Sequence, residues 1–234
     1  MINMNPYRFD DLWGIFHKSE GSINKHLLTI YALAIGMDAK RVIDLGIGST
    51  TRTLRLAMKS TGGKVYSCDY DKERYLKLLD QQSENWELHL TNSTEFLKRM
   101  SPPFDFAVHD AAHDYVQVKK DLELIIPMMR KFSIVVIHDT QHSKLGRQMM
   151  AALQYISSIY NVTYTHLPYS YGLTILRVES SEFGFVPPPW KKQGVKDTTV
   201  AFEELEFHKF KRSSYSALYW YRKLKKLIFT KFFI

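Results

Sequence analysis

Cysteine is nearly absent from this sequence, which has Cys68 alone among 234 residues. A single thiol excludes a disulfide framework and a zinc site built from several thiolates. Long apolar runs are also missing, because no stretch approaches the roughly 18 residues that span a bilayer. The first residues lack the basic start and apolar core of a signal peptide. We therefore expect a cytoplasmic protein, with any membrane contact peripheral.

Net positive charge is almost absent from most of the chain and is concentrated at its end. Residues 1–184 hold 21 Lys and Arg against 20 Asp and Glu, whereas residues 185–234 hold 11 against 4. The net charge of +8 therefore belongs to the C-terminal segment and gives little support to nucleic-acid binding by the main part. A stiff break at residues 186–190, which read VPPPW, predicts a domain over 1–184 and an extension over 185–234.

Short apolar runs rich in β-branched residues alternate with helical patterns between residues 23 and 178. The expected strands are 41–45, 64–68, 86–90, 104–109, 134–138, 161–167 and 173–178, and the expected helices are 50–60, 72–82, 94–100, 115–129 and 145–159. This alternation predicts an α/β fold with a doubly wound, mostly parallel sheet of seven strands, closed by an antiparallel last strand. Ligands of such sheets bind beyond the carboxyl ends of the strands.

The first expected strand ends in a glycine loop, residues 44–51, which read DLGIGSTT. Gly46 and Gly48 let the backbone turn sharply and come close to a ligand. A dinucleotide-binding loop would have a third glycine where Thr51 stands. Asp44 would repel a pyrophosphate but suits a cationic ligand with an ammonium group, such as S-adenosylmethionine. The alternative is a tight turn between strand and helix with no ligand.

An acid follows the second expected strand, in residues 65–71, which read VYSCDYD. Asp69 stands about 20 residues beyond the glycine loop, where a carboxylate can accept hydrogen bonds from both ribose hydroxyls. Asp71 competes for this role, but it also suits the N-cap of the next helix. We assign the ribose to Asp69 and the cap to Asp71.

Four motifs, in order, carry a family resemblance: residues 42–50 (VIDLGIGST), 65–71 (VYSCDYD), 104–115 (FDFAVHDAAHDY) and 134–140 (IVVIHDT). Over roughly residues 20–180 the chain resembles class I S-adenosylmethionine-dependent methyltransferases, which have a Rossmann-like sheet. It is most similar to small-molecule O-methyltransferases of the catechol type and to the group of cephalosporin-hydroxylase-like and rhamnosyl O-methyltransferases.

The resemblance implies that the methionine part of the cofactor is held by the glycine loop and its flanks, namely Asp44, Gly46, Gly48 and Ser49. Asp69 would hold the ribose. Asn92 and Ser93 match the family position that meets the adenine, although they suit a loop and helix cap equally well. Asp110 would lie beside both the cofactor and the acceptor.

The resemblance also implies a divalent cation. In catechol-type relatives an aspartate at position 110 binds the cation, and Asp139 matches a second carboxylate ligand, a pair that suits Mg²⁺. The family has Asn where this chain has Thr140, so His138 is a candidate replacement and would shift the preference toward Mn²⁺ or Fe²⁺. The alternatives are that Asp110 caps a helix and that His109 or His138 simply packs in the sheet.

His113 is our candidate general base, near the position where catechol-type relatives have a lysine. Methyl transfer to an alcohol requires alignment of the acceptor oxygen with the methyl group and removal of a proton, and a histidine suits the second task. The alternative is that His113 packs beside Tyr115. His142 is the reserve candidate.

The last segment, residues 207–234, has eight Lys or Arg, nine aromatic residues and no acid. It could pack on the domain or on a second copy of the chain in a homodimer, lie on an anionic membrane surface, or bind nucleic acid. We rank nucleic acid last because residues 1–184 add no basic surface.

The sequence thus predicts an O-methyltransferase that acts on a hydroxyl of a small molecule or glycan. Three rival hypotheses are a nucleic-acid methyltransferase that grips RNA or DNA through residues 207–234, a nicotinamide-dependent oxidoreductase, and a membrane-tethered scaffold that has kept only the fold.

Overall fold

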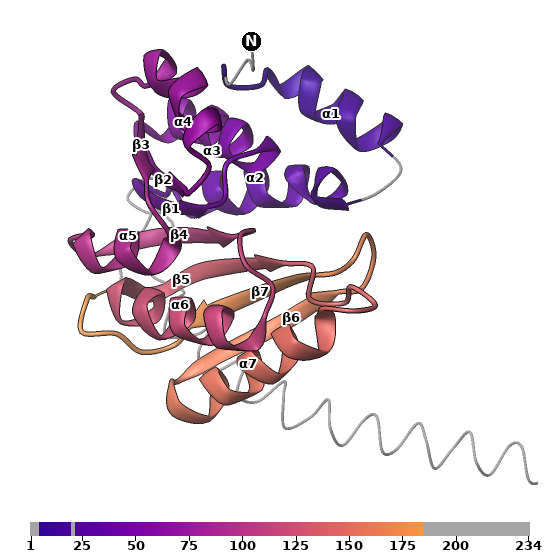
Figure 1. The fold of residues 1–234 in the computed structure, drawn as a ribbon, viewed down its shortest axis with the longest axis vertical. Coiled ribbons are helices and arrows are strands. Elements are labelled where there is room, and N and C mark those ends of the chain that lie inside the picture. Colours follow the sequence, from indigo (N-terminus) through magenta and orange to yellow (C-terminus); the bar gives the residue numbers. More distant parts are fainter. Residues whose placement is uncertain (1–4, 20–21, 185–234) are drawn as a thin grey trace, which may run out of the picture. The chain divides into compact units, whose positions relative to one another are not determined.

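The computed structural model describes residues 5–19 and 22–184. The predicted extension, 185–234, lies outside them, together with the membrane, nucleic-acid and dimer contacts predicted for it. Within the described residues one sheet has the strand order β3-β2-β1-β4-β5-β7-β6 (Figure 1). Its strands are β1 (Arg41–Leu45), β2 (Lys64–Asp69), β3 (Trp86–Leu90), β4 (Phe104–His109), β5 (Met129–His138), β6 (Val162–Leu167) and β7 (Leu173–Val178).

The directions of the strands confirm the predicted doubly wound sheet. Strands β3, β2, β1, β4 and β5 are parallel, and β7 is antiparallel to both β5 and β6. Leu45 pairs with Cys68 on one side and with His109 on the other. The carboxyl ends of β2, β1 and β4 therefore lie at one edge, where the strand order reverses and a ligand crevice is expected.

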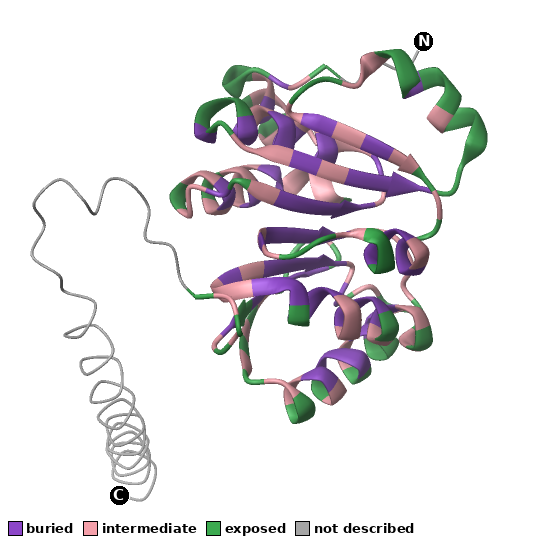
Figure 2. Cartoon of the chain, turned by 90° about the vertical axis from the view of Figure 1, so that its left-hand side faces the viewer, coloured by how far each residue is buried: buried purple, intermediate pink, exposed green. Residues whose placement is uncertain are grey.

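Helices cover both faces of the sheet. One face packs against α2 (Leu27–Gly36), α3 (Ser49–Thr61) and α4 (Lys72–Leu78), and the other against α5 (Ser93–Arg99), α6 (Tyr115–Met128) and α7 (Gly146–Ile159). Alternate residues of β1 supply the two cores, since Val42 faces the first group and Ile43 the second. Buried residues line the strands and the sheet-facing sides of the helices (Figure 2).

An N-terminal segment lies against the start of α3. It contains α1 (Phe9–Lys18), followed by a 3₁₀ turn, η1 (Ser22–Lys25). Tyr7 is buried, the Arg52 guanidinium lies 3.8 Å from the centre of its ring, and Arg52 Nε donates to the Asn5 carbonyl at 2.9 Å. Among the described helices none combines the length and the apolar character needed to cross a membrane.

The element boundaries agree closely with the sequence prediction, apart from β5. This strand begins at Met129, five positions before the predicted start, because Met129 pairs with Phe104 ahead of a register shift. The sequence of residues 129–133 did not indicate a strand. Within this part of β5, Phe132 has a positive φ of 65°. The predicted helix 72–82 is divided into α4 and a short 3₁₀ turn, η2 (Leu79–Gln81).

Candidate active site

The glycine loop between β1 and α3 needs a glycine at one of its two positions. Gly46 has φ +93°, and a Cβ there would overlap the backbone oxygen of Asp110, in the loop after β4. Gly48 has an extended φ of −177°, and a Cβ at that position would meet no atom within 4 Å. Gly46 therefore serves the close approach of two loops, whereas Gly48 borders open space.

Asp44 is fully buried beneath this loop. Its Oδ2 accepts hydrogen bonds from Thr51 Oγ1 at 2.6 Å and Ser67 Oγ at 2.8 Å, and its Oδ1 has no hydrogen-bond partner among the described residues. Burial raises the pKa of Asp44 to about 7, although the two hydrogen bonds oppose the rise. A carboxyl group whose pKa is raised to about 7 and whose Oδ1 lacks a hydrogen-bond partner among the described residues therefore lies beneath the loop.

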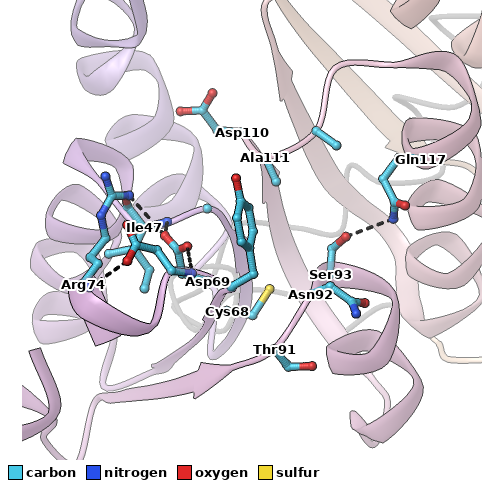
Figure 3. Close-up of a pocket in the computed structure, with 14 residues that line it drawn as sticks. Ile47, Cys68, Asp69, Arg74, Thr91, Asn92, Ser93, Asp110, Ala111 and Gln117 are labelled. Carbon is cyan, nitrogen blue, oxygen red and sulfur yellow. Dashed lines mark hydrogen bonds and ion pairs between the residues drawn. The ribbon is translucent and has the colours of Figure 1, made fainter. Parts of the chain in front are cut away.

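A cavity of about 700 Å³ opens at the carboxyl ends of β1 to β4. Its walls come from four loops and the start of α6 (Figure 3), and the lining residues are Gly46, Ile47, Cys68, Asp69, Tyr70, Asp71, Arg74, Thr91, Asn92, Ser93, Asp110, Ala111, Ala112 and Gln117. Burial raises the pKa of the Cys68 thiol, so the only cysteine lines this cavity as a neutral side chain.

Asp69 lies in the cavity wall with part of its carboxylate already bonded. Its Oδ1 accepts from the Asp71 amide at 2.9 Å, and its Oδ2 lies 3.1 Å from Arg74 Nη1. Arg74 Nη1 also donates to the Ile47 carbonyl at 3.0 Å, so this side chain joins Asp69 to the glycine loop (Figure 3). Asp71 accepts from the Arg74 amide at 3.0 Å, which confirms it as the N-cap of α4.

Asn92 and Ser93 line the opposite part of the cavity. Asn92 Oδ1 accepts from the Glu95 amide at 2.9 Å and caps α5, so its capping role is real. Ser93 Oγ accepts from Gln117 Nε2 at 3.1 Å, and the same amide group donates to Asp121 Oδ1 at 2.8 Å. A buried acid on α6 therefore fixes the orientation of Gln117 beside the cavity.

At the edge of the cavity, Asp110, His113 and Asp139 place one potential ligand atom each within 4.8 Å of the others. His113 Nε2 lies 3.0 Å from Asp139 Oδ2. This close contact with the Asp139 carboxylate raises the pKa of His113 more than burial lowers it. Burial alone would raise the pKa of Asp139, but the contact with His113 and the neighbouring histidines hold it below its usual value.

The other polar residues of β4 and β5 have different surroundings. His109 is fully buried, and its Nε2 lies 3.2 Å from Asp121 Oδ2, so it packs in the sheet as one alternative predicted. His138 is also buried, and its Nδ1 lies 3.1 Å from Asp110 Oδ1. The structure groups His113, and not His138, with the two carboxylates. Asp110 is not a helix cap, because Asp114 caps α6 by accepting from the Gln117 amide at 3.0 Å.

Comparison with known proteins gives the decisive match. Residues 43–140 match a family model described as a methyltransferase domain. The chain contains a class I S-adenosylmethionine-dependent methyltransferase domain. No curated protein matches the chain. The family match sets aside the nicotinamide-dependent oxidoreductase that the glycine loop alone allowed.

Solved structures share the fold of this methyltransferase at low sequence identity. An O-methyltransferase from Bacillus cereus, in complex with S-adenosylhomocysteine (SAH), has 14% identity and a TM-score of 0.58 over 74% of this chain and 92% of its own. The SAH-bound methyltransferase PaMTH1 from Podospora anserina has 12% identity and a TM-score of 0.57 over 77% of this chain and 100% of its own. Cofactor-bound Rv0187 from MTB has 16% identity and a TM-score of 0.56 over 73% of this chain and 89% of its own.

The structure brings most of the predicted site residues to one end of the methyltransferase sheet. Those that line the cavity are Gly46, Asp69, Asn92, Ser93 and Asp110. Asp44, Gly48 and Ser49 do not line it, and Ser49 Oγ instead lies 3.5 Å from the Tyr7 hydroxyl. His142, the reserve base, lies 5.0 Å from the ring of Tyr171. Sequence reasoning missed Arg74 and Gln117, which lie on helices and belong to no motif.

Proposed function

We propose that this methyltransferase transfers a methyl group from S-adenosylmethionine to a hydroxyl of a small molecule or sugar, with a divalent cation beside the acceptor. The observation that carries the proposal is the group of Asp110, His113 and Asp139, with ligand atoms within 4.8 Å of one another. Asp110 also lines the cavity, so one residue borders both the proposed cofactor site and the proposed cation site.

The cavity has features that fit the cofactor, which when bound supplies a methyl group on a positively charged sulfur. Gly46 leaves the wall without a side chain. Asp44 lies buried outside the lining, and its unpartnered Oδ1 would suit a cationic group that reaches beneath the loop. We propose that residues 44–49 hold the methionine part and Asp69 the ribose. Arg74 already donates to one oxygen of Asp69, so a bidentate ribose contact would share that oxygen with Arg74. Asn92 and Ser93 remain our candidates for the adenine.

The second group fits a hard or borderline cation. Two carboxylates and one imidazole suit Mg²⁺ or Mn²⁺, and the imidazole favours Mn²⁺ over Mg²⁺. A bound cation lowers the pKa of an oxygen ligand and so eases loss of the acceptor proton. Asp110 and Asp139 follow the ends of the neighbouring strands β4 and β5, so the sheet holds the two carboxylates in place.

Two roles for His113 fit its contact with Asp139, and cation affinity separates them. As the general base of our prediction, His113 takes the acceptor proton while Asp139 orients its ring, and His113→Gln lowers turnover by about 10²- to 10⁴-fold with cation affinity unchanged. As the third ligand, the same variant loses cation affinity. Calorimetry with Mn²⁺, together with turnover measurements on this variant, decides between the two.

An aromatic rim beside Asp139 supports a ring-bearing acceptor. Tyr169 and Tyr171 are exposed in the turn between β6 and β7, and the Gln141 amide donates to the Tyr171 carbonyl at 2.7 Å. The His142 ring lies against Tyr171. Exposed aromatic faces of this kind can stack on a phenol or a sugar ring, so we propose an acceptor of that class.

The test is transfer of labelled methyl groups into a panel of phenols, glycans and RNA, with and without EDTA. We expect labelling of a phenol or glycan, loss of labelling on chelation, and recovery with Mg²⁺ or Mn²⁺. Labelling of RNA alone would overturn the acceptor class, and activity that is indifferent to EDTA would overturn the cation. Calorimetry with SAH tests the cofactor site, which is contradicted if Asp69→Ala binds as tightly as the wild type.

A further inference from the structure

We infer that His138 is a positioning residue that holds Asp110 and Asp139 at their working separation without itself binding the cation. The inference rests on the proposed function, because it concerns the same carboxylates. His138 is the last residue of β5, and only 2% of its side chain is exposed. It therefore contacts the two acids from the protein interior.

The contacts of His138 divide the carboxylate oxygens into two sets. Its Nδ1 lies 3.1 Å from Asp110 Oδ1 and 3.3 Å from Asp139 Oδ1. The other oxygen of Asp139, Oδ2, lies 3.0 Å from His113 Nε2. One ring nitrogen thus contacts one oxygen from each acid, and Asp139 keeps its second oxygen toward His113. Because ionised carboxylates only accept hydrogen bonds, the proton of a neutral His138 lies on Nδ1.

The backbone makes this arrangement possible at one residue. Successive side chains of a strand point to opposite faces, so His138 and Asp139 would ordinarily diverge. Asp139 has φ +60°, a left-handed conformation that is uncommon outside glycine. The turn at Asp139 brings its carboxylate to the nitrogen of the preceding residue, and the cost of that conformation is offset by the contacts made there.

A second buried histidine packs against the ring of His138. His26 is fully buried and lies edge-on to His138, with ring centres 5.7 Å apart. His26 Nε2 lies 3.0 Å from the Tyr169 carbonyl oxygen, and the Tyr169 ring stacks on it at 4.7 Å. Nε2 of His138 has no hydrogen-bond partner in the part of the chain that the structure describes. Among the described residues Nδ1 is the ring nitrogen that contacts the two acids.

Two near-isosteric substitutions separate positioning from ligation. The amide nitrogen of His138→Asn can replace Nδ1, whereas that of His138→Gln reaches the place of Nε2. We would measure Mn²⁺ affinity of the full chain by calorimetry, without cofactor, for the wild type, these two variants and His138→Ala. We expect His138→Asn to stay within about threefold of the wild type, and the Gln and Ala variants to bind about 10- to 100-fold more weakly, as loss of a partner behind a ligand typically does.

The outcomes distinguish failure of the inference from failure of the proposed function. Wild type that does not bind Mn²⁺ overturns the proposed cation site and the inference with it. Wild type that binds, with His138→Gln tight and His138→Asn weak, makes His138 a ligand through Nε2 and overturns the inference alone. Equal Mn²⁺ affinity in all four proteins would also overturn the inference alone. SAH calorimetry on each variant shows whether it is folded. If His138→Ala does not fold, the comparison of His138→Asn with His138→Gln still decides.

Discussion

The same substitution is predicted to destabilise the protein at one glycine of the loop after β1 and to leave stability nearly unchanged at the other. Gly46→Ala places a methyl group in the left-handed region and against the Asp110 backbone oxygen. We expect it to lower the free energy of unfolding by about 1 to 3 kcal/mol and to weaken SAH binding. Urea unfolding and calorimetry measure the two effects.

Gly48→Ala is the matched control, because its new methyl group would meet no protein atom within 4 Å. The free energy of unfolding should stay within about 0.5 kcal/mol of the wild type. Weaker SAH binding by this stable variant would indicate that the ligand occupies the space beside Gly48. Equal destabilisation by the two substitutions would contradict the assignment of the close approach to Gly46.

Asp44 makes stability depend on pH in a particular direction. Burial raises its pKa to about 7 in the folded protein, against an ordinary value of 3.8 for an exposed aspartate. The folded state thus binds this proton more tightly than the unfolded state, and the associated stability is present at low pH and lost as pH rises from about 4 to about 7. Asp44→Asn cannot titrate and removes this loss.

We therefore expect Asp44→Asn to gain stability relative to the wild type as pH increases, by at most about 1.4 kcal/mol per pH unit in that range. The asparagine oxygen can accept from Thr51 and Ser67 as Asp44 Oδ2 does. Urea unfolding of both proteins at pH 5, 6, 7 and 8, without cofactor, gives the comparison. Parallel pH profiles for the two would contradict a raised pKa at Asp44.

Among the elements, α6 begins at a cap that lies close to the proposed cation site. Asp114 caps the helix, whereas Asp110 belongs to the group with His113 and Asp139. Asp114→Ala should lower the free energy of unfolding by about 1 kcal/mol and leave Mn²⁺ affinity unchanged. Asp110→Ala, the matched control, should abolish Mn²⁺ binding without the loss of a cap. Loss of Mn²⁺ binding in Asp114→Ala, with loss of helix stability in Asp110→Ala, would contradict the assignment of the cap to Asp114 and of the cation to Asp110.

The sheet could be predicted from the sequence because its strands are short, apolar and bounded by turns. Strands β1, β3, β4 and β7 have the predicted limits. The helices α1 and α2 were not placed, and α2 is apolar almost all round, so it has no polar face to reveal its period. The start of β5 depends on a pairing with Phe104, which no local pattern contains.

The site could be predicted where a residue follows a strand and not where tertiary contacts decide. Asp69 is the last residue of β2 and Asp110 follows β4, and both reach the cavity, as their positions indicated. Arg74 reaches Asp69 from α4, and Gln117 reaches Ser93 from α6, so both contacts depend on how helices pack at the cavity and belong to no motif. The contact of His138 with two acids depends on the positive φ of Asp139, which the strand pattern cannot predict.

At the scale of the whole molecule, the excess of basic residues belongs to residues 185–234. The membrane contact predicted for this segment can be tested by substitution, without removing the segment. Lys223, Lys225 and Lys226 are three of its basic residues. Each contributes about 1 kcal/mol near an anionic surface, so their replacement by Glu should weaken binding to phosphatidylserine vesicles at least 100-fold. Co-sedimentation with the vesicles measures the bound fraction of each protein.

Vesicles of neutral lipid and a matched RNA provide the controls for this variant. SAH affinity should not change, because the predicted membrane contact and the proposed cofactor site involve different residues. Vesicle binding that survives the substitutions would argue against an electrostatic membrane contact. Steep salt dependence of RNA binding, lost in the variant, would instead favour the nucleic-acid alternative.

The contact between Gly46 and Asp110 has a consequence for the order of binding. The backbone of Asp110 lies against the glycine loop, while its side chain belongs to the group with His113 and Asp139. A ligand that displaces the loop therefore also displaces a proposed cation ligand. Such linkage is reciprocal: if the cofactor tightens cation binding, the cation must tighten cofactor binding by the same factor. Which of the two binds first would then follow from their concentrations, and the doubly occupied state would be reached cooperatively by either route.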